Sequence, residues 1–406
     1  MHFAPPASRA SFACGEVHWP VRASRSVPGM KCPTPGTGRW GCSLMLASRY
    51  GLGHNIKRAV RPALLVICLT SILSGVLVST LTRQPRGCPA TTFEATFLQL
   101  LTRDETRTEH EWRDLLERLH RQGIRTLIIQ WTSADGVDFY PGHTGTRAVA
   151  QIVPVILEAA READLRVWIG LQEDPSWWSL QDRSDTELER YFASRLVALE
   201  GRLPSLKALI EGGDPQTTVG WYITDEIDDT RWQSRGREEA LQEYLAGVVR
   251  LLGLVDRGRP VAISAFANGA QDPHRYAAQL SRLVRISGIK RLLFQDGTGA
   301  GKRTSAEAAL TARAIARSLS ASGTQFSVVV ELFNLNPSKS GAEPSVTSPA
   351  PVESMVDRLA AVAGVGDLPP ASFSNAHHLT ELGGPEAATR EAEWTALLAR
   401  CGTVAN

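Results

Sequence analysis

The sequence predicts an α/β fold, and three observations support this prediction. From about residue 92 onward, short apolar strand-like segments alternate with helical segments. Eight such alternations over roughly three hundred residues match the count and length of a (β/α)₈ TIM barrel. Residues 101–106 follow the first strand without a glycine, whereas a doubly wound open sheet would need a Gly-rich turn there. We therefore predict a (β/α)₈ barrel over residues 92–401.

The predicted strands are short, apolar and rich in β-branched or aromatic residues, as buried parallel strands are. They cover residues 93–100, 126–131, 166–172, 219–224, 260–266, 291–295, 326–332 and 371–376. Basic residues precede several of these segments, whereas acidic, amide and indole side chains follow them. The rim at which the strands end is therefore expected to carry the chemistry, as in other barrels of this kind.

Helices are predicted in the gaps from capping signals. Thr108, Ser184 and Thr304 are each followed three residues later by Glu, which is the pattern of a capping box. An apolar stripe at helical spacing runs through residues 241–249, and further helices cover about 351–362 and 385–398. Residues 334–348, rich in Ser, Pro and Gly, are predicted to form a mobile loop over a cleft.

The segment before the barrel is predicted to lie outside the fold. Residues 1–56 have no sustained period, so they are expected to be disordered, or absent if translation starts at Met45. Residues 63–81 are apolar and uncharged, and the segment 57–83 is predicted to be a single transmembrane or signal helix. Lys57, Arg58 and Arg61 precede the apolar stretch, so the N-terminus is expected in the cytoplasm. The barrel would then be periplasmic or extracellular, after a linker over residues 84–91, and cleavage of the helix is left open.

Composition and cysteine usage set further bounds. A net charge of +2 without a basic stripe predicts no nucleic-acid partner. Cys88 and Cys401 alone lie beyond the apolar segment, where a disulfide and two free thiols are both compatible with the sequence. No spacing resembles a zinc site, and neither a metal nor a cofactor is predicted. The sequence leaves the oligomeric state open.

Side chains suited to carbohydrate gather where the predicted strands end. Aromatic rings stack on the apolar face of a sugar, while amides and carboxylates bind its hydroxyl groups. The candidate substrate-binding residues are Gln99, Gln130, Trp131, Tyr140, Gln172, Glu173, Trp177, Tyr222, Asp225, Gln295, Asp296, Asn334 and His377. One member of the pair Trp177 and Trp178 is expected to stack on a sugar while the other packs beneath it. One of the pair His377 and His378 is predicted to line the cleft and donate a hydrogen bond to the sugar.

Two glutamates are the candidate catalytic residues. Glu226 directly follows the C-terminal end of the fourth predicted strand, and Glu331 lies at the C-terminal end of the seventh. Glycosidic cleavage needs two carboxyl groups that flank the scissile bond. In the large clan of retaining glycosidases these two strands carry the acid/base and the nucleophile, an analogy at the level of the fold. We predict that Glu226 is the proton donor and Glu331 the nucleophile or, in an inverting enzyme, the base. Asp225 is the substitute for Glu226, because adjacent residues on a strand point to opposite sides.

Several segments resemble a known family. They are residues 95–100, 123–132, 220–223 with 226–229, and 293–297, including the motifs Gln130-Trp131-Thr132 and Gly220-Trp221-Tyr222-Ile223. Over roughly residues 92–400 the chain resembles a bacterial family of glycosyl-hydrolase-like TIM barrels, catalogued as domain of unknown function 4434. The resemblance implies a barrel related to glycosidases. It also implies cleft positions for Gln99, Gln130, Trp131, Glu226 and Asp296.

These observations lead to two hypotheses from different classes. The first is an exported or membrane-anchored glycoside hydrolase that cleaves an oligo- or polysaccharide. The alternative is a non-catalytic carbohydrate-binding barrel for export or assembly of a surface polysaccharide, which would need the aromatics but no acid pair. A Gly-rich stretch at residues 296–304 fails the phosphate-loop pattern, since Arg303 stands at the Ser/Thr position, and it is predicted to be a flexible loop.

Overall fold

The computed structural model describes residues 87–141, 147–148, 151–336 and 346–402. Eight parallel strands form a closed barrel in the order β1-β13-β10-β9-β8-β7-β6-β2. The strands are β1 (Ala95–Leu98), β2 (Thr126–Ile129), β6 (Arg166–Gly170), β7 (Thr218–Ile227), β8 (Val261–Ala265), β9 (Arg291–Gln295), β10 (Gln325–Glu331) and β13 (Ala371–Phe373). The eight predicted strands and the (β/α)₈ barrel are confirmed.

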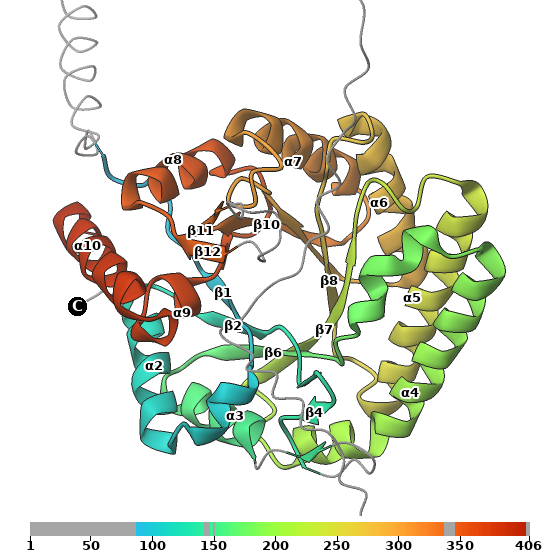
Figure 1. The fold of residues 1–406 in the computed structure, drawn as a ribbon, viewed down its shortest axis with the longest axis horizontal. Helices are drawn as coiled ribbons and strands as arrows, with labels where there is room; N and C mark the ends of the chain where they lie inside the picture. The colour runs from blue at the N-terminus through green and yellow to red at the C-terminus, as the bar shows by residue number, and fades with distance from the viewer. Residues whose placement is uncertain (1–86, 142–146, 149–150, 337–345, 403–406) are drawn as a thin grey trace, which may run out of the picture. The chain divides into compact units, whose positions relative to one another are not determined.

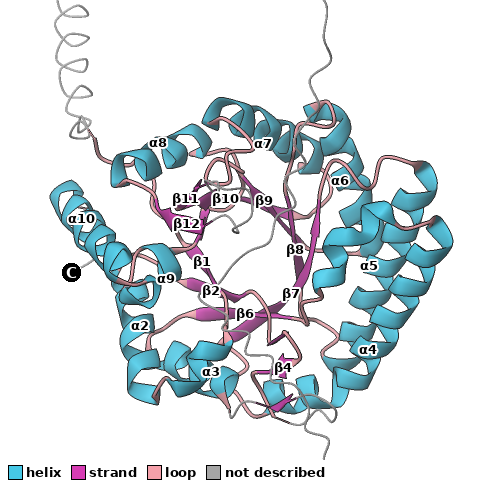
Figure 2. Cartoon of the chain, viewed as in Figure 1, coloured by secondary structure: helices cyan, strands magenta, loops and turns pink. Residues whose placement is uncertain are grey.

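Helices form a ring around the barrel, on the outside of the strands (Figures 1 and 2). They are α2 (Glu109–Arg121), α3 (Ile152–Glu162), α4 (Asp185–Glu211), α5 (Arg235–Val255), α6 (Pro273–Ser287), α7 (Ser305–Leu319), α8 (Val352–Val362), α9 (Asn375–His378) and α10 (Pro385–Cys401). The three predicted capping boxes are confirmed, because Thr108, Ser184 and Thr304 each accept a bond from the backbone N–H of the Glu three residues on.

Strand alternation divides the core into two parts. Outward-facing strand residues pack against the helices in one large apolar cluster. Inward-facing residues form a second cluster that fills the barrel: Ala95, Phe97, Ile128, Trp168, Tyr222, Ala262, Leu293, Val329 and Ala371. The barrel interior is therefore packed with side chains, and the next inward positions along each strand lie toward the C-terminal rim.

Two segments differ from the predictions. The segment predicted as a mobile loop has ordered ends, because β11 (Phe333–Asn336) pairs antiparallel with β12 (Val346–Pro349), while residues 337–345 lie outside the described part. The eighth strand ends at Phe373 instead of residue 376. There Ser374 caps the short helix α9 by accepting the backbone N–H of His377, so the chain turns helical where a longer strand was expected.

Short elements border the C-terminal rim. The 3₁₀ turns are η1 (Thr102–Thr106), η2 (Pro175–Asp182) and η3 (Glu381–Gly383). A small sheet of β3 (Ser133–Ala134), β4 (Val137–Asp138) and β5 (Arg147–Ala148) follows β2.

Cys88 and Cys401 form a disulfide with a Cα–Cα distance of 5.7 Å. The sequence was compatible with either a disulfide or two free thiols, and the structure has the disulfide.

The predicted membrane segment is not described. Residues 1–56, the segment 57–83 and its apolar stretch 63–81 all lie outside the described residues, as do the first residues of the predicted linker. None of the helices in the described part of the chain is long and apolar enough to cross a bilayer.

Candidate active site at the C-terminal rim of the barrel

Three polar side chains occupy inward positions directly above the apolar interior. Gln295 lies two residues beyond the interior residue Leu293 on β9, and Glu331 lies two residues beyond Val329 on β10. Glu226 lies near the C-terminal end of β7. The pairing of β7 with β8 shifts in register there, between Ile223 and Ile227. Side chains two residues apart on a strand share a face, so these groups converge at the rim.

Only one of the two carboxyl oxygens of Glu226 has a hydrogen-bond partner among the described residues. Its Oε1 accepts a hydrogen bond from Gln295 Nε2 at 2.7 Å. Its Oε2 is buried and has no hydrogen-bond partner among the described residues. Burial raises the pKa of Glu226 to about 7, against the opposing effect of the Gln295 hydrogen bond. The carboxyl group can therefore keep a proton near neutral pH and present it from Oε2.

The backbone of Glu226 is fixed by neighbouring side chains. Its carbonyl oxygen accepts a hydrogen bond from Trp177 Nε1 at 2.9 Å and from Arg231 Nη2 at 3.4 Å. Arg231 also donates to the carbonyl of Trp177 at 2.6 Å and forms a buried ion pair with Asp228. This arrangement anchors the end of β7, and with it the position of the Glu226 side chain.

Glu331 accepts a backbone hydrogen bond from the loop that follows β9. The N–H of Ala300 donates to Glu331 Oε2 at 2.7 Å. A Cβ atom at Gly299 would lie 2.8 Å from Glu331 Cβ and 2.4 Å from the carbonyl oxygen of Phe333, so only glycine permits this close approach. Burial, followed by the neighbouring Asp296 carboxylate, raises the pKa of Glu331. The Ala300 hydrogen bond and the charges of Lys302 and Arg358 act in the opposite direction and favour the ionised form.

Asp296 supports the loop instead of facing a ligand. It accepts hydrogen bonds from the N–H and hydroxyl of Thr298, at 3.1 and 2.9 Å, and from the N–H of Glu331 at 3.3 Å. Asp296 is 1% exposed, so the predicted contact with substrate is corrected to a structural role. The same residue explains why the Gly-rich stretch at 296–304 is an ordered turn.

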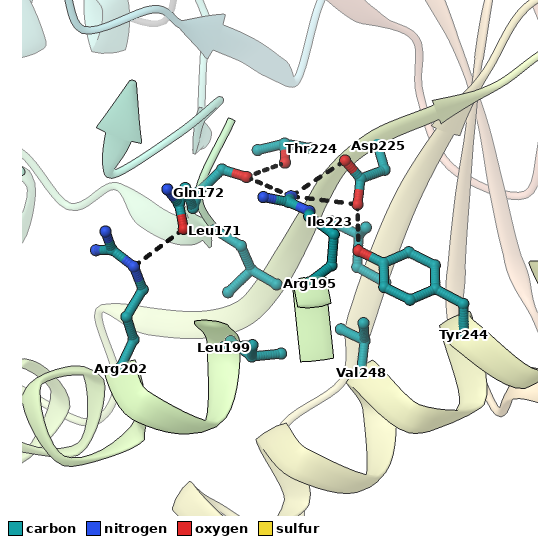
Figure 3. Close-up of a pocket in the computed structure, with 10 residues that line it drawn as sticks. All are labelled: Leu171, Gln172, Arg195, Leu199, Arg202, Ile223, Thr224, Asp225, Tyr244 and Val248. Carbon is teal, nitrogen blue, oxygen red and sulfur yellow. Dashed lines mark hydrogen bonds and ion pairs between the residues drawn. The ribbon is translucent and has the colours of Figure 1, made fainter. Parts of the chain in front are cut away.

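Asp225 points toward Arg195 and Tyr244, as Figure 3 shows, and these two residues lie on the outer helices α4 and α5. Its carboxylate accepts hydrogen bonds from Arg195 on α4, at 3.2 Å to Oδ1, and from the hydroxyl of Tyr244 on α5. Gln172 lies on the same outer side, where its Oε1 accepts from Arg202 Nε at 3.1 Å. The substrate-binding role predicted for Asp225 and Gln172 is therefore wrong, because helices on the outside of the barrel engage both side chains.

Three predicted aromatic contacts are also corrected. Tyr140 is 1% exposed and bonds to Arg202, which in turn pairs with Asp138. Tyr222 is fully buried inside the barrel, with its hydroxyl donating to Ser264 at 2.8 Å. Trp177 is 2% exposed and packs among Phe192, Trp232 and Tyr244. All three rings stabilise the fold.

Trp178 is the more exposed tryptophan of its pair. It is partly buried and packs against Phe266, with ring centroids 6.2 Å apart. The guanidinium of Arg231 lies 5.2 Å from the centroid of its ring. If one of the two tryptophans stacks on a sugar, the burial of Trp177 leaves Trp178 for that role.

The remaining predicted residues differ in their exposure and in whether their polar groups already have hydrogen-bond partners. Gln130 is 7% exposed, and its Oε1 has no hydrogen-bond partner among the described residues. The half-buried Trp131 donates from its indole to the carbonyl of Leu100 at 2.7 Å. Glu173 is partly exposed, and burial together with Asp135 and Asp174 raises its pKa to about 7.

His377 and Asn334 are engaged by the protein itself. The N–H of Gln99 donates to His377 Nε2 at 3.2 Å, and burial lowers the pKa of His377 to about 4. His377 is therefore neutral at neutral pH, with its second ring nitrogen as the N–H donor. Asn334 Oδ1 accepts a hydrogen bond from Arg358 Nη2 at 2.5 Å.

Sequence reasoning missed three groups near Glu331: the N–H of Ala300, Lys302 and Arg358. Ala300 and Lys302 lie in the Gly-rich loop at residues 296–304, which the sequence pattern identified only as a mismatch to a phosphate loop. Arg358 is on α8, and its Nη1 donates to the carbonyl of Glu331 at 2.7 Å. A backbone donor leaves no signal in side-chain identity, and the helical position of Arg358 does not reveal which strand end it reaches.

No group of three or more His, Cys, Asp or Glu side chains that could hold a metal ion occurs within the described ranges. We therefore assign no metal ligand, and the groups that converge on the rim are carboxyls, amides and one ammonium.

Comparison with known proteins places these features in a family. The family described as "Domain of unknown function (DUF4434)" matches residues 93–378. YbcH of Escherichia coli (strain K12), an uncharacterized protein, is 34% identical over 202 residues, which cover 50% of this chain and 64% of YbcH. The match thus spans less than two thirds of the length of that relative.

A solved structure has a similar fold. It is a candidate alpha-L-fucosidase from Bacteroides thetaiotaomicron, with a TM-score of 0.62 and 16% sequence identity. The alignment covers 79% of this chain and 97% of that protein. At this identity the similarity shows a shared barrel fold and assigns no activity.

Proposed function

The chain belongs to the family described as "Domain of unknown function (DUF4434)", and we propose that it is a glycoside hydrolase with Glu226 and Glu331 as its catalytic pair. The observation that carries this proposal is the asymmetric bonding of Glu226. Gln295 binds Oε1, while Oε2 is buried without a partner in the described structure and belongs to a carboxyl with a raised pKa. A general acid needs this combination of a retained proton and an oxygen free to meet the leaving group.

Each glutamate has a distinct role in the proposed reaction. Glu226 Oε2 donates its proton to the glycosidic oxygen as the bond to the leaving sugar breaks. Glu331 is assigned as the ionised partner: the Ala300 N–H and the charges of Lys302 and Arg358 favour that state, whereas burial and Asp296 oppose it and raise the pKa of Glu331 to about 8, above that of Glu226. It attacks the anomeric carbon in a retaining reaction or removes a proton from the attacking water in an inverting one.

Substrate contacts are proposed for the rim residues that keep unused or exposed groups. Gln130 offers a buried acceptor without a partner in the described chain, and Glu173 offers a partly exposed carboxyl. Gln99, Trp131, Asn334 and His377 remain proposed contacts at the edge of the same rim. Trp178 is added as the stacking platform in place of Trp177.

We also propose that the barrel is exported and anchored by residues 63–81, with the N-terminus in the cytoplasm. The apolar, uncharged composition of that stretch and its basic flank support this proposal. The Cys88–Cys401 disulfide supports it independently, because such bonds persist in oxidising compartments. Protease added to intact cells with a permeabilised outer layer should degrade the barrel. Protection of the barrel until the cytoplasmic membrane is lysed would contradict export.

The hydrolase proposal is tested with E226Q and E331Q in the full-length chain. Both variants should lose at least about 100-fold in the cleavage rate of a responsive aryl glycoside or exopolysaccharide. They should still bind the oligosaccharide, because Gln keeps the shape and one acceptor. E243Q, at an exposed position on α5, is the matched control and should cleave normally. Binding without cleavage in the wild-type chain, unchanged in both variants, would instead favour the carbohydrate-binding barrel.

A further inference from the structure

Arg358 on α8 makes hydrogen bonds across the point where the chain leaves the barrel and enters the β11–β12 hairpin. Its Nη1 donates to the carbonyl oxygen of Glu331, the last residue of β10, at 2.7 Å. The same nitrogen donates to the carbonyl oxygen of Phe333, the first residue of β11, at 2.8 Å. Its Nη2 donates to Asn334 Oδ1 at 2.5 Å. One guanidinium thus joins the end of the strand that carries Glu331 to the start of the hairpin.

The carbonyl oxygen of Phe333 depends on a donor from outside the hairpin. Phe333 stands opposite Pro349 in the register of β11 and β12. The adjacent bond runs from the N–H of Ala350 to the carbonyl of Leu332, at 2.9 Å. In an antiparallel ladder this places Phe333 at a non-hydrogen-bonded position, so its carbonyl points away from β12. Arg358 supplies the donor that this carbonyl needs, and it thereby ties the hairpin to α8.

The hairpin in turn contacts the loop that follows β9. The backbone N–H of Leu335 donates to the carbonyl oxygen of Gly299 at 2.8 Å. The next residue of the loop, Ala300, donates its N–H to Glu331 Oε2 at 2.7 Å. A path of hydrogen bonds therefore runs from Arg358 through the hairpin and the β9 loop to the carboxyl group of Glu331.

We infer that Arg358 is a positioning residue for Glu331: its three hydrogen bonds hold the β11–β12 hairpin in the orientation that brings the Ala300 N–H onto the Glu331 carboxyl. A guanidinium suits this role, because it presents several N–H donors in a rigid planar fork. The ammonium of a lysine is a compact charge on a flexible stem and does not reproduce that fork. Arg358 donates to two backbone carbonyls and an amide oxygen, so it acts on the reaction through Glu331.

The inference rests on the proposed function only for its catalytic consequence. A nucleophile or base that is held loosely loses rate, because the reacting atoms meet less often in the productive geometry. R358M should therefore lower kcat by about tenfold or more while KM changes by less than about twofold, since Glu331 acts in the bond-making step. The hydrogen bond between Ala300 and Glu331 can be measured without any substrate.

The test follows the Ala300 amide proton by NMR in the full-length chain labelled with ¹⁵N-alanine. Its signal is assigned by its loss in A300S. R358M should speed exchange of this proton with solvent by about tenfold or more, because the loop is no longer held against Glu331. R358K should behave as R358M does, since one ammonium cannot bridge the three oxygens. R358Q provides the same comparison if R358M does not fold.

The Ala312 amide in the same spectra reports general stability, because Ala312 is a buried residue of α7. Its exchange rate should stay near that of the wild type in the Arg358 variants. Equal acceleration at Ala300 and Ala312 would show general destabilisation and overturn the inference.

The matched control is R313M. Arg313 on α7 donates to the carbonyl oxygen of Ala361 at 3.3 Å at an exposed site, so this variant removes the same kind of bond from the outer surface. It should leave the Ala300 amide and kcat unchanged. Normal Ala300 exchange in folded R358M or R358Q would overturn the inference, as would full rescue by R358K. Failure to find a hydrolysed sugar would count against the proposed function and leave the exchange measurement unaffected.

Discussion

Gln295 Nε2 donates a 2.7 Å hydrogen bond to Glu226 Oε1, although β8 lies between the strands that carry the two side chains. The bond fixes which carboxyl oxygen is available, since Oε2 has no partner in the described part of the chain. It also favours the ionised form of Glu226 and so limits the rise in pKa that burial causes. Gln295 thereby sets both the orientation and the acidity of the proposed proton donor.

Replacing Gln295 by Leu should move the alkaline limb of the pH profile. Loss of the donor raises the pKa of Glu226 further, so the acid stays protonated to higher pH. We expect the alkaline limb of kcat/KM to shift upward by about 1 pH unit, with a lower maximum because the carboxyl is less well oriented. Q233L, which removes an exposed amide in the segment after β7, is the control. An alkaline limb that stays in place would contradict the assignment of Glu226 as the acid.

The stability of E226Q should depend less on pH than that of the wild type. Burial raises the pKa of Glu226 from 4.5 to about 7 in the folded state, so its contribution to stability is present below about pH 4.5 and is lost as pH rises through 7. The shift corresponds to roughly 3 kcal/mol. E226Q should therefore be more stable than the wild type at pH 8 by up to that amount, as measured by urea unfolding. E243Q should show no such gain.

Replacing Asp225 by Asn should destabilise the barrel without a specific effect on ligand binding. Asn removes the charge that pairs with the buried Arg195, and breaking a buried pair costs about 3–5 kcal/mol. D256N, in a partly exposed pair with Arg259, should cost less than about 1 kcal/mol. Urea unfolding gives both values. Full stability of D225N with loss of oligosaccharide binding would restore the predicted role of Asp225 in the cleft.

The two adjacent tryptophans should respond differently to substitution. Trp178 is the more exposed ring, so W178A should raise KM or weaken oligosaccharide binding about tenfold or more, with little loss of stability. Trp177 is buried and donates to the Glu226 carbonyl, so W177A should cost about 3–5 kcal/mol in unfolding free energy. Calorimetric titration with an oligosaccharide and thermal unfolding separate the two effects. The opposite pattern would exchange their roles.

Reducing the Cys88–Cys401 disulfide should lower stability without altering the rim. The bond closes a span of 313 residues, for which the chain-entropy account gives about 6 kcal/mol as an upper value. C88S should therefore unfold at lower urea concentration than the wild type, to the same extent as C88S/C401S. Glycosidase activity per folded molecule should be unchanged in both variants. Reductant should destabilise the wild type and have no effect on either variant.

Much of the fold follows from local patterns in the sequence. Eight apolar strand segments and three capping boxes predict the barrel because they depend on residues close together in the chain. The local sequence pattern predicts the ends of the strands less accurately than it predicts their presence. The pattern ended the fourth strand at residue 224, whereas β7 continues to Ile227 and carries Asp225 and Glu226 within it. Pairing with β8, which resumes at Ile227 after a register shift, extends the strand beyond its apolar run.

The sequence by itself placed Glu226 and Glu331 at the ends of the fourth and seventh strands, because strand order and strand ends are local properties. Tertiary structure decided which neighbours reach them. Asp225 faces Arg195 and Tyr244 on the outer helices, whereas Glu226 meets Gln295 inside the rim. The backbone N–H of Ala300 reaches Glu331 only because the loop after β9 folds against β10. Burial and charge at each carboxyl depend on these long-range contacts, so its pKa is a property of the folded barrel.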